Sequence, residues 1–254
     1  MAARSAETPA ATPALYAELY DFLSAPISRT DCGRKCAPLN GGEPVCCSTG
    51  NAIPIAHKAE FALLKERTDL WHRFRPFDAT SKKIVGELAH AYCAIECKGV
   101  AHCERDNRTL ACRAFPFVPY VDRAGAFLGF TYFWEFEATC WVISNLTIVD
   151  RRFLKELVAA FEHLFAADPS EREACREHVA SMRRIFTRQR RAVPVIGLDG
   201  ALLRALPRTG KLVPARPTDF EKHGPYRSET AYKRAVKEAG GTLPPAPAGG
   251  YLAP

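Results

Sequence analysis

Cysteine is the residue that most constrains this chain, because eight of its ten cysteines fall into two clusters. The first cluster holds Cys32, Cys36, Cys46 and Cys47, and the second holds Cys93, Cys97, Cys103 and Cys112. Each cluster contains a pair of cysteines separated by only three residues, so one tight loop can direct two sulfurs at the same point. Thiolates spaced in this way are typical metal ligands. The pattern therefore predicts one or two metal centres at which the two loops meet.

The identity of the metal stays open, because thiolates bind both zinc and iron–sulfur clusters. Cys46 and Cys47 are adjacent, and neighbouring side chains of an extended chain point to opposite sides. We therefore expect them to serve two centres, to divide into one ligand and one packing residue, or to bind separate irons of a [4Fe–4S]-type cluster. Disulfides are less favoured, because the segment from Met1 to Leu15 has no continuous apolar core and does not resemble a secretory signal.

Other residues near the clusters have simpler interpretations. His102 could complete a mixed cysteine–histidine site, but the clusters already supply enough thiols. Cys140 and Cys175 are expected to be small residues of the hydrophobic core. Basic residues flank the clusters and either offset thiolate charge or lie exposed for solubility; they are Arg34, Lys35, Arg105, Arg108 and Arg113. We find no nucleophile–base pair in the sequence, so catalytic residues stay unknown.

The second cluster carries a resemblance to a known family. The stretch Cys97–Cys103, then Arg108, then the segment Cys112-Arg-Ala-Phe-Pro-Phe resembles the second half of the YkgJ-type family of zinc- or iron-chelating cysteine-cluster proteins. The Cys-Arg-x-Phe-Pro-Phe segment is the more specific part of this resemblance. The resemblance implies metal binding without a common reaction. Some members, such as the flagellin lysine methylases, are enzymes with an iron–sulfur cluster.

The first half of that family is also represented here. The first cysteine cluster is followed by the apolar residues Ile53 and Ile55 and by a predicted helix that holds Glu60. Nine residues separate Cys36 from Cys46, which is wider than the family's usual spacing, and Cys93 is additional. The resemblance covers about residues 30–120, and it does not say which thiols share a centre.

The hydrophobic pattern predicts an α+β fold, in which a small antiparallel sheet packs against several helices and the cysteine loops form one metal-binding end. We expect a disordered leader over residues 1–15, a cysteine-cluster domain over residues 16–191, and a hairpin with a flexible tail over residues 192–254. Helices are predicted over residues 15–23, 57–74, from 81 to about 92, 151–167, 168–190 and 228–238. Strands are predicted over residues 51–55, 115–121, 127–136 and 140–149, with a hairpin over residues 193–213.

The net charge is +7, and arginines concentrate in the helix predicted over residues 168–190. They could bind nucleic-acid phosphates, but pairing with glutamates of the same helix is favoured. No apolar run approaches the roughly 18 residues of a membrane span, so we expect a cytoplasmic protein without a membrane partner. Three functions remain open: a structural zinc module, an iron–sulfur-dependent redox or methyl-transfer enzyme, and a zinc-stapled nucleic-acid-binding module.

Overall fold

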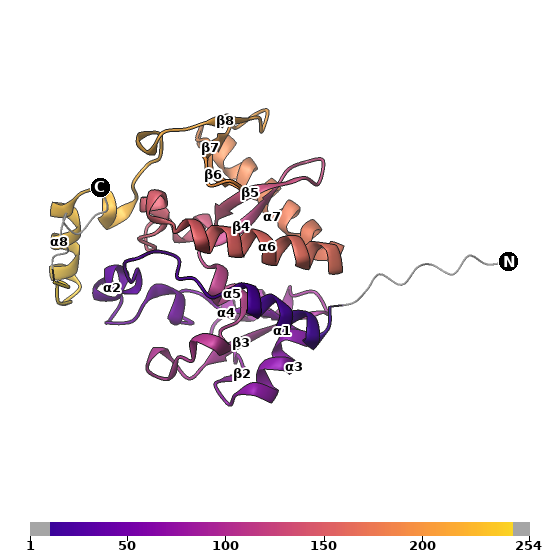
Figure 1. Cartoon of the computed structure of the whole chain (residues 1–254). Coiled ribbons are helices and arrows are strands. Elements are labelled where there is room, and N and C mark those ends of the chain that lie inside the picture. Colours follow the sequence, from indigo (N-terminus) through magenta and orange to yellow (C-terminus); the bar gives the residue numbers. More distant parts are fainter. Residues whose placement is uncertain (1–10, 246–254) are drawn as a thin grey trace.

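The computed structural model describes residues 11–245 and confirms the predicted α+β class. Two antiparallel sheets lie on either side of the long helix α6, one of three strands in the order β1-β3-β2 and one of five strands in the order β4-β5-β6-β7-β8 (Figure 1). The helices are α1 Pro13–Phe22, α2 Gly33–Cys36, α3 Lys58–Arg67, α4 Ala79–Gly86, α5 Leu110–Ala114, α6 Arg151–Ala167, α7 Pro169–Arg188 and α8 Glu229–Glu238. The strands are β1 Ile55–His57, β2 Trp71–Arg73, β3 Tyr92–Cys97, β4 Phe117–Val121, β5 Phe127–Tyr132, β6 Val193–Gly197, β7 Leu202–Ala205 and β8 Leu212–Pro214.

The three-stranded sheet lies in the half of the molecule that carries the cysteine loops, and most of it was not predicted. The helix expected over residues 57–74 is too long, because α3 ends at Arg67 and Thr68 adopts an extended conformation. The Thr68 hydroxyl oxygen then accepts a hydrogen bond from the Leu70 amide, and the chain continues into β2. The loop expected from Cys93 onward is wrong as well, because residues 92–97 form the central strand β3, which holds the fully buried Ile95.

The helix predicted to begin near Ser81 exists as α4 but has a different start and a shorter length. Asp78 caps it, and Ser81 is the third helical residue, whose side chain completes the capping box. The predicted end near residue 92 is wrong, because α4 ends at Gly86 and Tyr92 belongs to β3, and Ile84 of α4 is 38% exposed. The short helix therefore covers little of the core.

Helices α6 and α7 are confirmed with nearly the predicted bounds. Asp150 caps α6, whose apolar face is buried between α1 and α7. Asp168 caps α7 by accepting a hydrogen bond from the Ser170 amide, and Pro169 occupies the first helical position, where no amide hydrogen is needed. Glu171 in the first turn of α7 accepts a hydrogen bond from the Tyr92 hydroxyl at 2.7 Å.

The five-stranded sheet contains both predicted hairpins. Asp122 closes the β4–β5 turn by accepting hydrogen bonds from two backbone amides, and Gly200 provides the positive φ angle that the β6–β7 turn requires. Strand β6 pairs with β5, so the chain after residue 192 completes the main sheet. The strand predicted over residues 140–149 is wrong: the segment forms 3-10 turns, because the buried Asn145 side chain donates to the Trp141 carbonyl.

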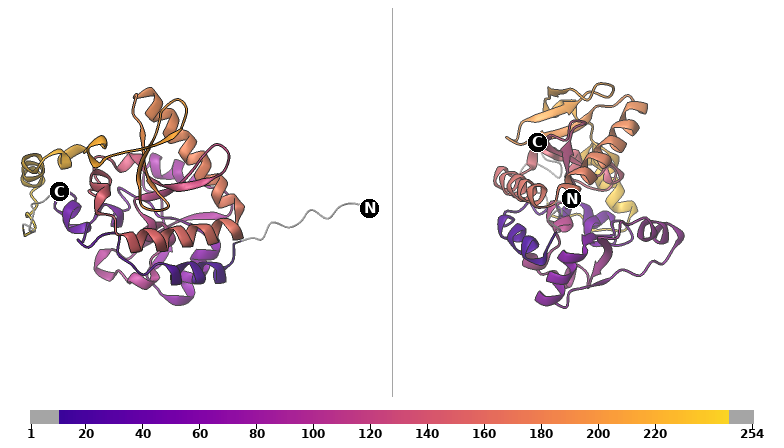
Figure 2. Two further views of the ribbon diagram at one scale, coloured as in Figure 1. Left: turned by 45° about the horizontal axis from the view of Figure 1, so that its top comes forward. Right: turned by 90° about the vertical axis from the view of Figure 1, so that its right-hand side faces the viewer.

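Both ends of the described chain pack against the body of the protein. Helix α1 begins at Pro13, inside the segment expected to be a leader, and Thr12 caps it. The predicted helix over residues 228–238 is confirmed as α8, which lies beside α2 (Figures 1 and 2). The Tyr232 hydroxyl donates a hydrogen bond to the Lys35 carbonyl at 2.9 Å, which ties α8 to the first cysteine cluster. Most of the predicted leader, residues 1–10, and the last nine residues of the predicted tail lie outside the described residues.

Candidate metal centre

Both cysteine loops border one cavity of about 440 Å³. The first loop contributes α2 and the 3-10 turn of residues 45–47, and the second contributes the end of β3, the following irregular segment and α5. Seven of the eight predicted ligands and one further cysteine line the cavity: Cys32, Cys36, Cys46, Cys47, Cys97, Cys103, Cys112 and Cys140. All ten cysteines of the chain are free thiols. Sulfurs that lie up to 108 residues apart in the sequence, from Cys32 to Cys140, thus surround the same space.

One predicted ligand lies outside the cavity, and one further cysteine lines it. Cys93 was a predicted ligand, but it does not border the cavity; it is 3% exposed and pairs with Ala56 across β1 and β3, inside the hydrophobic core. Cys140 is a core residue as expected, 7% exposed, and it also lines the cavity. It has no cysteine close to it in the sequence, so spacing could not have assigned it to the cluster. Cys175 lies on α7 and packs against the core, as expected.

The adjacent cysteines lie closer together than an extended chain would allow. Residues 45–47 form a 3-10 turn, and the Cys46 and Cys47 sulfurs are 4.0 Å apart. The expectation that they point to opposite sides is therefore wrong, because its premise was an extended backbone. The hydrogen bond between the thiols raises the pKa of Cys46 and lowers the pKa of Cys47, so one thiolate is stabilised by its neighbour's proton.

Burial keeps most of the other thiols protonated. It raises the pKa of Cys32 to about 12 and the pKa of Cys112 to about 12, and it also raises the pKa of Cys36 and Cys97. Desolvation penalises the charged thiolate, whereas a bound cation reverses this preference and expels the protons. Apart from Cys47, these thiols are thus neutral on their own and would release protons when a metal ion binds.

A buried carboxyl group fixes the helix that carries Cys112. Glu60 on α3 is fully buried, and its Oε1 accepts hydrogen bonds from the Tyr20 hydroxyl at 2.7 Å and from the Leu110 amide at 2.5 Å. Leu110 is the first residue of α5, so Glu60 holds the end of the helix two residues before Cys112. Burial raises the pKa of Glu60 to about 7.

Arg113 fixes the same loop from the other side. Its guanidinium donates hydrogen bonds to three backbone carbonyls, those of Arg108 at 2.9 Å, Leu23 at 2.8 Å and Asp106 at 2.8 Å. This side chain therefore ties the irregular segment before α5 to the end of α1. These contacts give Arg113 a structural role: it supports the wall of the cavity but does not line the cavity itself.

The remaining flanking residues differ in their relation to the sulfurs. Arg108 lines the cavity, and its Nε donates to the Cys103 sulfur at 3.1 Å, so it would offset thiolate charge. Arg34 is exposed and His102 does not line the cavity. Trp71 donates from its indole nitrogen to the Asn107 carbonyl at 2.7 Å and so links β2 to the second loop.

The thiols share a cavity but do not form a closed ligand set. Within residues 11–245, no three His, Cys, Asp or Glu side chains are grouped closely enough to hold a metal ion. A metal ion would have to draw the sulfurs together, and such movement costs least in the loops and 3-10 turns of residues 24–32, 37–50 and 98–109. The donor set itself, thiols with one arginine beside them, fits zinc or an iron–sulfur cluster.

The chain matches no family model, no curated protein and no solved structure. The resemblance to the YkgJ-type family thus stays a prediction. No helix within the described residues combines the length and the apolar character needed to cross a membrane.

Proposed function

We propose that this chain is a metal-binding protein whose cysteine cavity takes zinc or a [4Fe–4S]-type cluster. The observation that supports this proposal best is the set of eight thiols, from two distant loops and from Cys140, that borders one cavity. All eight are free thiols, and a cytoplasmic location, which belongs to the same proposal, would keep them reduced. The resemblance to the YkgJ-type family points to the same chemistry.

The number of thiols and the size of the cavity favour more than one metal atom. A tetrahedral zinc ion takes four ligands, and the cavity offers eight sulfurs. Its volume of about 440 Å³ also leaves room for more than a single ion. Two zinc ions or one iron–sulfur cluster with spare thiols are both consistent with these values. The cavity residues would bind the metal, and Arg108 would offset the thiolate charge.

The test replaces thiols inside the cavity and compares them with thiols outside it. A Cys47→Ser and Cys97→Ser double variant removes one sulfur from each loop and should lose most of the bound metal. The matched control is Cys93→Ala and Cys175→Ala, which also removes two cysteines but leaves the cavity intact. Metal per chain is measured after anaerobic purification. Equal metal content in the two variants would contradict the proposal, and so would loss of metal in the control alone.

A further inference from the structure

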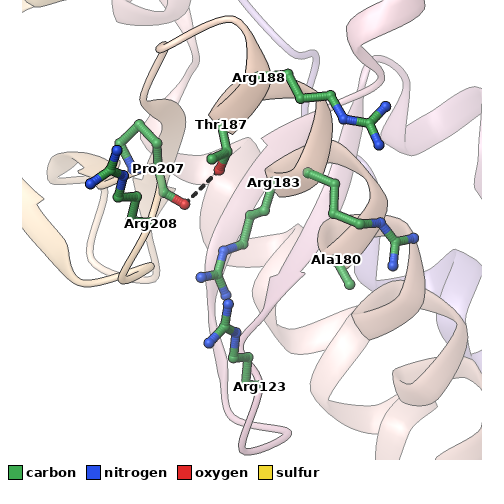
Figure 3. A pocket seen from close by; sticks show the side chains of 8 residues that line it. Arg123, Ala180, Arg183, Thr187, Arg188, Pro207 and Arg208 are labelled. Atoms are coloured by element: carbon green, nitrogen blue, oxygen red, sulfur yellow. Dashed lines mark hydrogen bonds between the residues drawn. The ribbon is translucent and has the colours of Figure 1, made fainter.

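A second cavity, of about 590 Å³, lies beside the C-terminal half of α7 (Figure 3). Helix α7 supplies three arginines, the β4–β5 turn supplies a fourth, and the turn between β7 and β8 supplies a fifth. These residues, which we call the arginine pocket, are Arg183, Arg184, Arg188, Arg123 and Arg208. None of the residues that line it is acidic. Five cations thus gather around one space without a counter-charge in its walls.

Arg183 lies at the centre of this arrangement and lacks partners. It is only 7% exposed, and its Nε and Nη2 atoms are buried without a hydrogen-bond partner. Figure 3 shows its guanidinium facing that of Arg123. Buried charges in proteins are paired, because an unpartnered charged group loses its hydration without compensation. Two guanidinium groups that face each other in a cavity without acidic lining form a geometry that suits an anion.

The backbone around Arg183 leaves room for its guanidinium. Gly210 has a φ of +71° in the turn before β8, and a Cβ atom there would lie 2.2 Å from Nη2 of Arg183. The positive φ favours glycine at this position, and the absence of a side chain leaves the space to the guanidinium. The Thr187 hydroxyl donates to the Pro207 carbonyl at 2.7 Å and holds the same turn against α7. The fold thus encloses the Arg183 guanidinium without supplying a carboxylate to pair with it.

Other arginines of the same region do have partners, which shows that the fold can supply them. Arg176 on α7 pairs with Glu173, and Arg191 pairs with Glu137 at 2.7 Å. Arg172 lies over the ring of Phe165. Among the described residues, the five arginines of the pocket form no ion pair with a carboxylate. The expectation that the arginines of this helix pair mainly with its own glutamates therefore holds for Arg176 and not for the pocket.

We propose that the arginine pocket binds a phosphate group, either free or as the ester of a small molecule. Guanidinium groups match phosphate oxygens in a two-pronged geometry, and several of them favour an anion with more than one charge. The pocket volume lies in the range of small-molecule sites. Arg183 is too deeply buried for the backbone of a nucleic-acid duplex, whereas a compact phosphate group can enter between Arg183 and Arg123.

Calorimetric titration of the full chain tests this proposal. The probes are inorganic phosphate, pyrophosphate, adenosine 5′-monophosphate and a single-stranded oligonucleotide, in a chloride buffer of constant ionic strength. Saturable binding of a phosphate probe is expected. Tighter binding of the nucleotide would identify an ester as the ligand, and tighter binding of the inorganic probes would identify a free phosphate. Binding of the oligonucleotide alone would overturn the proposal in favour of a nucleic-acid surface.

Variants locate the site. Arg183→Met should weaken binding of the best phosphate probe by about tenfold or more, because it removes charged hydrogen bonds at the floor of the pocket. Arg151→Gln is the matched control, since Arg151 is an exposed arginine on α6 outside the pocket. Arg188→Gln with Arg208→Gln changes only the rim and keeps the test valid if the Arg183 variant does not fold. Equal affinity in the wild type and these pocket variants would overturn the proposal, as would an equal loss in the Arg151 control.

Discussion

The cysteine cavity and the arginine pocket gather opposite chemistry at two places in one fold. The cysteine cavity holds several thiols that burial keeps neutral, Cys32 and Cys112 among them, and it gains from a cation that displaces their protons. The arginine pocket holds permanent positive charges, and it gains from an anion that pairs with them. The difference matters for the ligand-free protein: neutral thiols rest in their cavity at little electrostatic cost, whereas Arg183 is buried with its charge. The cysteine cavity should therefore stabilise the protein when a metal ion binds. The arginine pocket should lower the stability of the ligand-free protein, because Arg183 is buried with its charge.

Removal of the metal ion should give the largest effect, and it should affect the cysteine cavity far more than the arginine pocket. Chelation of anaerobically purified protein should lower the free energy of unfolding by at least about 5 kcal/mol, because metal–thiolate binding fixes two loops that have little apolar core of their own. Urea unfolding of the loaded and chelated protein measures the change. Phosphate affinity of the arginine pocket should change much less, provided the chelated protein is still folded. An unfolding curve that chelation leaves unchanged would contradict a metal role in the fold.

The next effect concerns the buried carboxyl group below the cysteine cavity. Glu60 has a pKa of about 7 in the folded protein against an ordinary value of 4.5. Between these pH values Glu60 of the folded protein holds a proton that the unfolded chain has released, so the contribution of Glu60 to stability falls as pH rises through this window. The loss amounts to about 3 kcal/mol in metal-free protein. Glu60→Gln should abolish that fall, which denaturation at a series of pH values would detect; an identical pH profile would refute the assignment.

Arg113 tests whether the loop wall of the cysteine cavity depends on backbone contacts. Arg113→Met removes three hydrogen bonds to carbonyl groups and should destabilise the protein by about 2 kcal/mol. It should also weaken metal retention, since α5 and Cys112 lose their support. Arg105→Gln, an exposed arginine of the same loop, is the matched control and should change neither property. Thermal denaturation and metal content measured on both variants decide the point.

The smallest effect has the opposite sign. In a buffer without phosphate, Arg183→Met should stabilise the protein by about 1 kcal/mol, because it removes a buried charge that lacks partners. Arg188→Met, at the exposed rim, should have almost no effect. Denaturant midpoints of the two variants make the comparison. Destabilisation by Arg183→Met alone would show that the guanidinium is already satisfied in the ligand-free protein, and the contrast between the two sites would then fail.

The fold could be predicted where the sequence shows a helical pattern of apolar residues over several turns, or residues that cap the start of a helix. Helix α6 has five large apolar residues on one face, and α7 has Asp168 and Pro169 at its start, so both were found with nearly correct ends. The strands β1 and β2 have three residues each, which is too short for an alternating pattern. Strand β3 was mistaken for a loop because two of its six residues are cysteines, which had been assigned to a metal-binding turn.

The two sites also differ in how far the sequence alone could predict them. Local spacing was enough to group most of the cavity thiols, whereas Cys140 reaches the cavity only through the tertiary fold. The arginine pocket joins α7 to turns that begin near Arg123 and Pro207, and no sequence period connects these segments. Arg183 and its neighbours were visible as a basic stretch, but the absence of carboxylates around them required the packed structure.

Metal and sulfide analysis of anaerobically purified protein is the most direct test of the central claim that the cysteine cavity is a metal centre. We predict either about two zinc ions per chain without sulfide, or iron and acid-labile sulfide in equal amounts with a broad visible absorption band. In both cases the Cys47→Ser and Cys97→Ser variant should lose this content. Folded native protein that carries neither zinc nor iron after growth in metal-replete medium would contradict the account.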